Sequence, residues 1–332
     1  MMLYPLRFEP IYQYRLWGGR RLATLLREPL PNGGLVGEAW ILSDRVDHPS
    51  RVADGPLKGW RLGQLMDTAQ DQLMGKLAWR FPRFPLLLKF LDALEMLSVQ
   101  VHPAVGVDAK TEAWVVLEAG KTSCIYAGLK PHTTPEALRE SLGNGTVPDN
   151  LMGIDPKPGD GVFIPAGTVH SLGGDVVVFE IQQNSDTTFR LYDWDHLDAN
   201  TGMPRQLQID QALAAIDFEE SNAGLVVAVE EAVSPVERKR LFDCQYFSVW
   251  TLDGREEFTV GAEEMPRVLV CTAGAGQIEH GGISYPVARG DVWLLPAVVG
   301  KSVFRPSGLV ALLEIAIPFQ ADQEREPHAW SA

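Results

Sequence analysis

Two stretches of the chain repeat the same order of glycine, apolar and proline residues. One is PGDGVFIPAGTVH (158–170) and the other is RGDVWLLPAVVGK (289–301), and both contain Gly-Asp, an apolar run and Pro-Ala. Pro165 and Pro296 lie at the same place in the two copies. Such self-similarity indicates that one supersecondary unit has been repeated. The repeat therefore predicts a duplicated β-sandwich, and it limits the possible folds more than any other feature of the chain.

Short apolar runs dominate the rest of the sequence. They are rich in Val, Ile and Trp and end at Gly, Pro or Asp, as in all-β sandwiches and barrels. Seven such runs are 37–43, 97–103, 112–119, 160–166, 175–183, 267–273 and 291–297. Helical spacing occurs in only three places, at about 61–80, 134–142 and 206–216. The sequence thus predicts a mainly β chain with a few peripheral helices.

The length of 332 residues fits two or three packed units. The repeat indicates a first unit over residues 1–228 and a second over 229–332, and the charge-rich stretch 229–240 reads as their connection. Lys301 stands in the second copy where the first has His170. A site in the first unit would therefore be lost in the second, which is predicted to hold no metal.

Composition excludes several partners. The net charge of −14 argues against nucleic acid, because no basic run offsets the excess of carboxylates. Charged residues interrupt the most apolar stretch, 84–101, which excludes a membrane span there, and the N-terminus lacks the apolar segment of a secretory signal. The three cysteines form no CxxC pair, which favours a reducing compartment and a cytoplasmic location.

Four possible metal ligands lie in the first copy. In SVQVHP (98–103), Gln100 and His102 share one face of a predicted strand, and Glu112 opens another run. His170 ends the pattern G-x5-P-x-G-x2-H, which resembles the second metal motif of the cupin sandwich. Imidazole and carboxylate groups suit zinc or another first-row divalent metal, and an amide oxygen can complete the set. Taken alone, a histidine is more often a hydrogen-bonded core or surface residue, and Glu112 would pass for the start of a strand.

The match to cupins in general is incomplete. The first cupin motif usually contains His-x-His, whereas Gln100 occupies the first of these positions, and Gly174 stands where Asn is expected. Six segments instead follow one branch in order: YRLWGG (14–19), GEAWILSD (37–44), LSVQVHP (97–103), KTEAW (110–114), IPAGTVHSL (164–172) and QNSDTTFRLYDWDH (183–196). The sequence resembles the type I phosphomannose isomerases (mannose-6-phosphate isomerases). The short span between Glu112 and His170 resembles the compact bacterial form.

This resemblance implies an enzyme that interconverts mannose 6-phosphate and fructose 6-phosphate through an enediol, with one zinc ion per chain. The residues that it implies as zinc ligands are Gln100, His102, Glu112 and His170. It also implies that Trp17 and Ser98 line the substrate cleft.

Three further residues are implied to surround the substrate: Lys110, Asp186 and Arg190. Lys110 could exchange protons, because burial near zinc would lower its pKa. Arg190 stays charged and could hold the enediolate or the phosphate. Asp186 either orients Lys110, shares its proton relay or is an ordinary turn residue. Lys89 and Lys130 are further candidates for phosphate binding.

Two other functions stay open. A non-catalytic sugar-phosphate-binding cupin would keep the metal but would have less need of Lys110 and Arg190. A metal-dependent cupin oxygenase would favour two histidines and one carboxylate around iron, and Gln100 as a fourth ligand counts against it. The sequence also leaves open a monomer or a homodimer and the role of His196, and it predicts a hairpin turn at His280.

Overall fold

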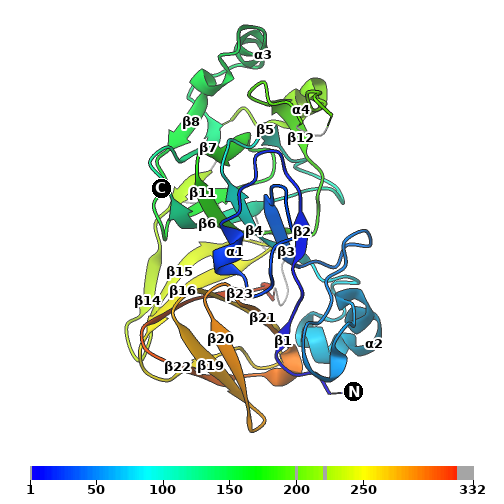
Figure 1. Ribbon diagram of the computed structural model, residues 1–332, viewed down its shortest axis with the longest axis vertical. Coiled ribbons are helices and arrows are strands. Elements are labelled where there is room, and N and C mark those ends of the chain that lie inside the picture. The colour runs from blue at the N-terminus through cyan, green and yellow to red at the C-terminus, as the bar shows by residue number, and fades with distance from the viewer. Residues whose placement is uncertain (1, 199–200, 220–222, 320–332) are drawn as a thin grey trace.

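The structure is a computed structural model that describes residues 2–198, 201–219 and 223–319. Its four antiparallel sheets form two β-sandwiches, one above the other in Figure 1. The seven-stranded sheet of the first sandwich has the order β13 (Gly224–Val226), β9 (Gly161–Ile164), β6 (Glu112–Ala119), β11 (Val176–Gln183), β4 (Leu86–Ala93), β3 (Glu38–Leu42) and β2 (Ile11–Gln13). Its five-stranded sheet has the order β12 (Phe189–Tyr192), β5 (Val99–Val101), β10 (His170–Gly173), β7 (Cys124–Leu129) and β8 (Leu151–Ile154).

The second sandwich lies below the first in Figure 1 and again combines two sheets. The larger sheet has the order β1 (Leu6–Arg7), β21 (Val292–Leu295), β18 (Arg267–Ala273), β23 (Val310–Ala316), β16 (Ser248–Gly254), β15 (Glu237–Asp243) and β14 (Val229–Ala232). The smaller sheet has the order β17 (Phe258–Val260), β22 (Ser302–Pro306), β19 (Ala275–His280) and β20 (Ile283–Ala288). The predicted mainly β, duplicated sandwich is confirmed.

Helices are short and peripheral. They are α1 (Leu22–Leu25), α2 (Leu62–Met74), α3 (Pro135–Asn144) and α4 (Ile209–Ala215), with 3₁₀ turns at Gly55–Leu57, Gly75–Leu77, Val147–Asn150 and Ala297–Val299. Helix α3 begins as its sequence predicts, because the Thr134 side chain accepts a hydrogen bond from the Ala137 amide and proline occupies the first turn. Among the described residues, no helix is long and apolar enough to cross a membrane.

Of the four apolar cores among the described residues, three lie within or between the two sandwiches. One fills the first sandwich around Trp114 and Val178, and another fills the second around Leu252 and Phe304. The largest lies between the two seven-stranded sheets and includes α2. Strand β11 contributes to two of these cores, because alternate residues point to opposite faces: Val177 packs between the sandwiches, whereas Val178 packs inside the first.

The stretch 229–240 was the expected connection, and this prediction is wrong, because its residues form β14 and most of β15. The sheet changes between β13 and β14, and we propose this point as the boundary between the two units. The N-terminal strand β1 crosses that boundary, since Leu6 pairs with Leu294 of β21. The predicted turn near His280 consists of Gly281 and Gly282, which both have positive φ and join β19 to β20.

Candidate metal and substrate site

The inner face of the first sandwich changes from apolar to polar at one end. Along β11, Val176 and Val178 belong to the apolar core, and Glu180 and Gln182 follow on the same face. Both polar residues are buried, with 3% and 0% of their surface exposed. Burial of polar groups is costly unless they find partners, so this end of the sandwich must hold a network or a ligand.

Two imidazoles and one carboxylate meet at this polar end. His102 follows β5, Glu112 begins β6 and His170 begins β10, and all three are buried. Their candidate ligand atoms lie within 4.8 Å of one another. Glu112 Oε2 is 3.4 Å from His102 Nε2, and Glu112 Oε1 is 3.4 Å from His170 Nε2. The structure thus brings together three of the four residues implied as ligands.

Backbone carbonyls orient both imidazoles. His102 Nδ1 lies 2.9 Å from the carbonyl oxygen of Thr187, and His170 Nδ1 lies 2.8 Å from that of Thr168. A carbonyl only accepts hydrogen bonds, so each Nδ1 carries the proton and each Nε2 presents its lone pair to the cluster. A histidine that binds a metal through Nε2 is held in the same way.

The electrostatics also favour metal-ready forms of these residues. Burial lowers the pKa of His102 to about 3 and lowers the pKa of His170, so both rings stay neutral at pH 7. Burial alone would raise the pKa of Glu112, but the charge of Lys110 holds it well below its usual value. His102 Nε2 and Glu112 Oε1 have no hydrogen-bond partner in the described chain. Neutral imidazoles, an ionised carboxylate and unpartnered donor atoms fit a divalent cation.

Gln100 connects the cluster to the cleft outside it. Its Nε2 lies 3.3 Å from His170 Nε2, and its Oε1 accepts a hydrogen bond of 3.2 Å from Ser98 Oγ. Ser98 Oγ in turn accepts one of 3.2 Å from Arg190 Nε. Val99 and Val101 point to the other face of β5, where both are fully buried beside α4.

A cleft of about 410 Å³ opens in front of the cluster. Of the residues predicted from the sequence to form the site, six line it: Trp17, Ser98, Gln100, Lys110, Asp186 and Arg190. Lys89 lines it as well, whereas Lys130 lines a separate cavity and His196 lies 3.4 Å from Glu95. Both carboxylates and cations line the cleft, so it suits a polar, charged substrate.

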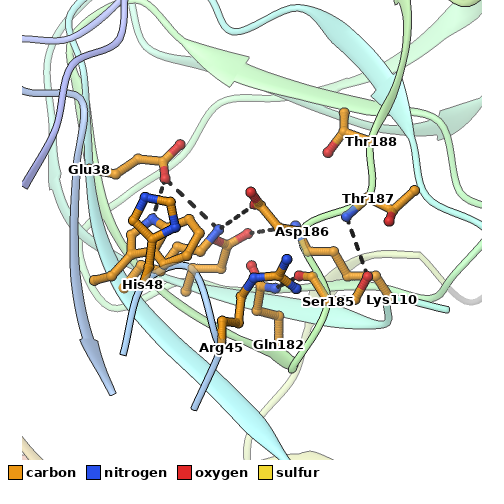
Figure 2. Close-up of polar contacts among 12 residues, drawn as sticks. Glu38, Arg45, His48, Lys110, Gln182, Ser185, Asp186, Thr187 and Thr188 are labelled. Atoms are coloured by element: carbon orange, nitrogen blue, oxygen red, sulfur yellow. Dashed lines mark hydrogen bonds and ion pairs between the residues drawn. The ribbon is translucent and has the colours of Figure 1, made fainter. Parts of the chain in front are cut away.

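Lys89 is the centre of the charged network on one wall. Its Nζ lies 3.3 Å from Glu180, 3.9 Å from Glu38 and 3.8 Å from Asp186, and 4.8 Å from the centre of the Trp40 ring. Figure 2 shows Glu38, Asp186 and Lys110 around this network. Among the described residues, Asp186 forms its only ion pair with Lys89.

Lys110 bridges the cluster and this network. Its Nζ lies 2.8 Å from Glu112 Oε2 and 3.7 Å from Glu180 Oε1. Burial alone would lower the pKa of Lys110. The negative charges of Glu112 and Glu180 outweigh burial, so the pKa of Lys110 is raised overall. For Glu180, burial disfavours the charged carboxylate and raises the pKa to about 7.

The cleft residues that were not predicted from the sequence include four charged ones, Arg15, Glu38, Glu180 and Arg205. Glu38 accepts hydrogen bonds from Arg15 and, at 2.6 Å, from Trp40 Nε1. A usable signal exists for Glu180, which is the one carboxylate inside the apolar run VVVFEI (176–181). Arg15 and Arg205 lie outside any strand and carry no such signal.

The fold and the site define a double β-sandwich with a buried His–Glu–His cluster beneath a cation-rich cleft. The family described as phosphomannose isomerase type I, catalytic domain, matches residues 6–115. A mannose-6-phosphate isomerase of Bacillus subtilis is 35% identical over 308 residues, which cover 90% of this chain and 94% of the relative. A mannose-6-phosphate isomerase of Streptococcus mutans is 32% identical over 90% of this chain and 94% of its own length.

Solved structures agree with these relatives. The mannose 6-phosphate isomerase of Bacillus subtilis superimposes with a TM-score of 0.85 at 30% identity, over 95% of this chain and all of the other. The enzyme of Salmonella typhimurium gives 0.72 at 16% identity over 96% of this chain and 100% of its own, which shows the shared fold alone. The chain belongs to the type I phosphomannose isomerases and is an isomerase of the aldose–ketose kind.

Proposed function

We propose that the protein interconverts mannose 6-phosphate and fructose 6-phosphate through an enediol. The observation that carries this proposal is the convergence of unpartnered Nε2 and carboxylate atoms beside two buried lysines in one cleft. Isomerisation must remove a weakly acidic proton next to a carbonyl and stabilise the charge that develops there. The cleft offers groups for both tasks.

We propose zinc as the metal, one ion per chain, held by Gln100, His102, Glu112 and His170. The two imidazoles and the carboxylate are a common zinc set, and the Gln100 amide adjoins it. When bound, such an ion polarises the substrate carbonyl and stabilises negative charge on its oxygen. Thr168 and Thr187 contribute by fixing the imidazole orientation through their carbonyl groups.

We assign proton transfer to the buried lysine and glutamate network. Lys110 Nζ lies 3.7 Å from Glu180 Oε1 and both residues line the cleft, so both groups can exchange protons with a substrate there. Glu180 has a pKa of about 7 and can therefore both give and take a proton at neutral pH. Lys89 joins Glu180 to Asp186, which makes Asp186 a positioning residue for that network.

We assign charge stabilisation to Arg190. Its guanidinium is fixed by Ser98 Oγ and by the Gln206 carbonyl, at 3.2 Å and 3.1 Å. A donor held in place before the reaction stabilises developing negative charge without reorganising. Trp17, which is 3% exposed, closes one wall with Trp114 and helps to keep water from the reacting carbons.

A coupled assay tests the proposal. Purified protein should form fructose 6-phosphate from mannose 6-phosphate, lose activity with a chelator and regain it with zinc. Metal analysis of the same sample should find one zinc per chain. A protein that binds the sugar phosphate without converting it would be a binding cupin, and iron with oxygen consumption would indicate an oxygenase; either result would refute the isomerase.

We also propose a cytoplasmic location, which is supported by the three free thiols of Cys124, Cys244 and Cys271. A monomer or a homodimer is proposed for the oligomeric state, and sedimentation of the purified protein distinguishes them.

A further inference from the structure

The carbonyl group that orients His102 belongs to a loop and not to a strand. Thr187, whose carbonyl oxygen lies 2.9 Å from His102 Nδ1, is one of residues 184–188, which link β11 to β12. Residues outside a sheet have no ladder of backbone hydrogen bonds to hold their carbonyl groups in place. The position of this carbonyl must therefore depend on other contacts of the loop.

The second imidazole is supported in a different way. The Thr168 carbonyl that faces His170 lies in a turn directly before β10. The Thr168 amide donates to the Pro165 carbonyl at 3.1 Å, and the preceding amide, that of Gly167, donates to another backbone carbonyl at 3.0 Å. The Thr168 hydroxyl has no hydrogen-bond partner in the described part of the chain. Backbone hydrogen bonds thus support this carbonyl directly.

Side chains hold the loop that carries Thr187. Ser185 Oγ accepts a hydrogen bond of 3.3 Å from the Thr187 amide and donates one of 2.9 Å to the Asp108 carbonyl. The Thr187 hydroxyl donates to Asp108 Oδ1 at 3.1 Å. Figure 2 shows the contact between Thr187 and Ser185 as a dashed line. Ser185 and Asp108 thus fix both the amide and the side chain of the residue whose carbonyl faces His102.

Burial makes the contacts of Ser185 hard to replace. Ser185 is only 3% exposed, and its carbonyl accepts a hydrogen bond from the fully buried Gln182 side chain. Removal of a buried hydroxyl leaves its partners without hydrogen bonds, which costs free energy unless they move. Without the Ser185 hydroxyl, the Thr187 amide and the Asp108 carbonyl would lose their partner, and the loop would be free to shift.

Asp108 belongs to an exposed connection between two site residues. Residues 103–109 join His102 to Lys110, and Val105 and Val107 in this connection are 83% and 97% exposed. In the described chain, the hydrogen bonds between this connection and residues 184–188 are those of Asp108. A buried histidine is therefore oriented through contacts that begin on the surface.

The loop also presents a residue of the cleft. Asp186 stands between Ser185 and Thr187, lines the cleft and lies 3.8 Å from Lys89. The contacts on both sides of Asp186 thus hold a segment that serves the imidazole and the cleft at once.

We propose that Ser185 and Asp108 are positioning residues, which hold the Thr187 carbonyl against His102 and so set the affinity of the metal site. The proposal rests on the metal site and the isomerase function proposed above. Partners that orient a metal-binding histidine typically contribute about 10- to 100-fold in metal affinity. Ser185 and Asp108 do not line the cleft, so their substitution should act through the groups that they hold.

Metal affinity and histidine NMR test the proposal. Ser185→Ala should weaken zinc binding on the order of 10- to 100-fold, as competition with a chelator measures. In the full chain with ¹⁵N-labelled histidine, the Nδ1–H signal of His102 should shift or exchange faster with solvent, whereas that of His170 should not. Ser248→Ala is the matched control, because it removes a buried hydroxyl that donates to Asp243 in the second unit, and it should change neither measurement.

Asp108 allows a second test at the surface. Asp108→Ala removes the acceptor of the Thr187 hydroxyl but keeps the backbone carbonyl that Ser185 uses. Zinc affinity should therefore fall by less, about 3- to 10-fold, the value of one hydrogen bond. Asp108→Asn keeps an acceptor oxygen and should restore most of the affinity.

The outcomes separate this inference from the proposed function. Unchanged zinc affinity with an unchanged His102 signal in folded Ser185→Ala would overturn it, and so would equal changes at His102 and His170. If Ser185→Ala does not fold, equal zinc affinity in Asp108→Ala and the wild-type chain would overturn it. A wild-type chain that binds zinc without converting mannose 6-phosphate would refute the proposed function, and a selective change at His102 would still support the positioning residues.

Discussion

The two sandwiches share their strand register but differ at the positions that matter chemically. Ile164 of β9 pairs with Glu112 of β6, and its counterpart in the repeat, Leu295 of β21, pairs with Arg267 of β18. Glu112 therefore corresponds to Arg267, as His170 does to Lys301. Two candidate metal ligands in the first unit are cations in the second. The two units therefore have the same arrangement of strands, and the candidate metal site depends on a few side chains that point into the first sandwich.

A buried carboxylate occurs at the same place in both units. Glu180 pairs with Trp114 in β6, and Glu314 pairs with Leu269 in β18, two positions from the Glu112 and Arg267 pairs. Glu314 has both oxygens satisfied at 2.9 Å, by Arg238 and by the Gly261 amide. Glu180 instead faces the cleft with two lysines. The comparison shows that one buried position can serve structure when its partners are complete and chemistry when they face a cavity.

The largest expected effect is loss of the metal from the first unit. His102→Ala and His170→Ala each remove one of the converging Nε2 atoms, and each should abolish stoichiometric metal binding and activity. Metal content by mass spectrometry, with folding checked by circular dichroism, measures this. One metal per chain retained in both variants would show that the ligands lie elsewhere.

Arg190 should matter far more than the half-buried Arg267 of the second unit. Arg190→Ala is expected to lower kcat on the order of 10²- to 10³-fold, because a preorganised charge partner is lost from the reacting site. Arg267→Ala, the control, should leave kcat nearly unchanged. A rise in KM with normal kcat in Arg190→Ala would instead show that Arg190 acts only on the phosphate.

The sequence predicted those site residues that lie close together in the chain or belong to a motif. Gln100 and His102 share a strand face, and His170 ends a glycine–proline turn pattern, so these positions could be found from spacing. Arg205 could not be found in this way, because its place depends on how residues 205–208 pair with β12. The two-residue strand β1 has too little pattern to predict that it joins the sheet of the second unit.

Cross-strand neighbours explain the remaining differences. The pKa of Lys110 depends on Glu180, which lies 70 residues further along the chain and comes close only because β11 pairs with β6. The sequence pattern of one strand predicts which of its side chains are buried. It does not predict which charged groups of neighbouring strands lie beside them. Charged residues within apolar runs, such as Lys89 and Glu180, are the signal that such a partner exists.

The second unit should contribute stability rather than chemistry. Phe304 is fully buried and stacks with Phe258 at 5.2 Å between ring centres. Phe304→Ala should lower the free energy of unfolding by about 3–5 kcal/mol, the usual cost of such a cavity. Denaturant unfolding measures the loss. Metal content and kcat of the folded variant should stay normal, and a loss of metal would mean that the two units are coupled.

The charged wall of the first unit should make its stability depend on acid. Burial raises the pKa of Glu38, but Lys89 and Arg15 outweigh it and hold the pKa at about 2. A lowered folded pKa gives stability that is present above the unfolded value of 4.5 and is lost as pH falls towards 2. Glu38→Gln should therefore cost up to about 3 kcal/mol at pH 7 and almost nothing near pH 2. A cost that does not change with pH would show that hydrogen bonding, not charge, carries the effect.

The smallest expected effect comes from restoring ligand types to the second unit. Arg267→Glu with Lys301→His returns a carboxylate and an imidazole to the positions of Glu112 and His170. Strand β17, which pairs with β22 as β5 pairs with β10, ends at Val260 opposite Ser302 and supplies neither a glutamine nor a histidine. The new carboxylate would also lie in the field of Glu314, which acts on Arg267 in the native chain.

Two ligands without the Gln-x-His strand should not hold an ion, so metal content should stay at one per chain. The double substitution in a His170→Ala background gives the cleaner measurement, because any metal found there must come from the second unit. Stoichiometric metal in that protein would show that the carboxylate and one imidazole suffice, and that Gln100 and His102 are not what distinguishes the two sandwiches.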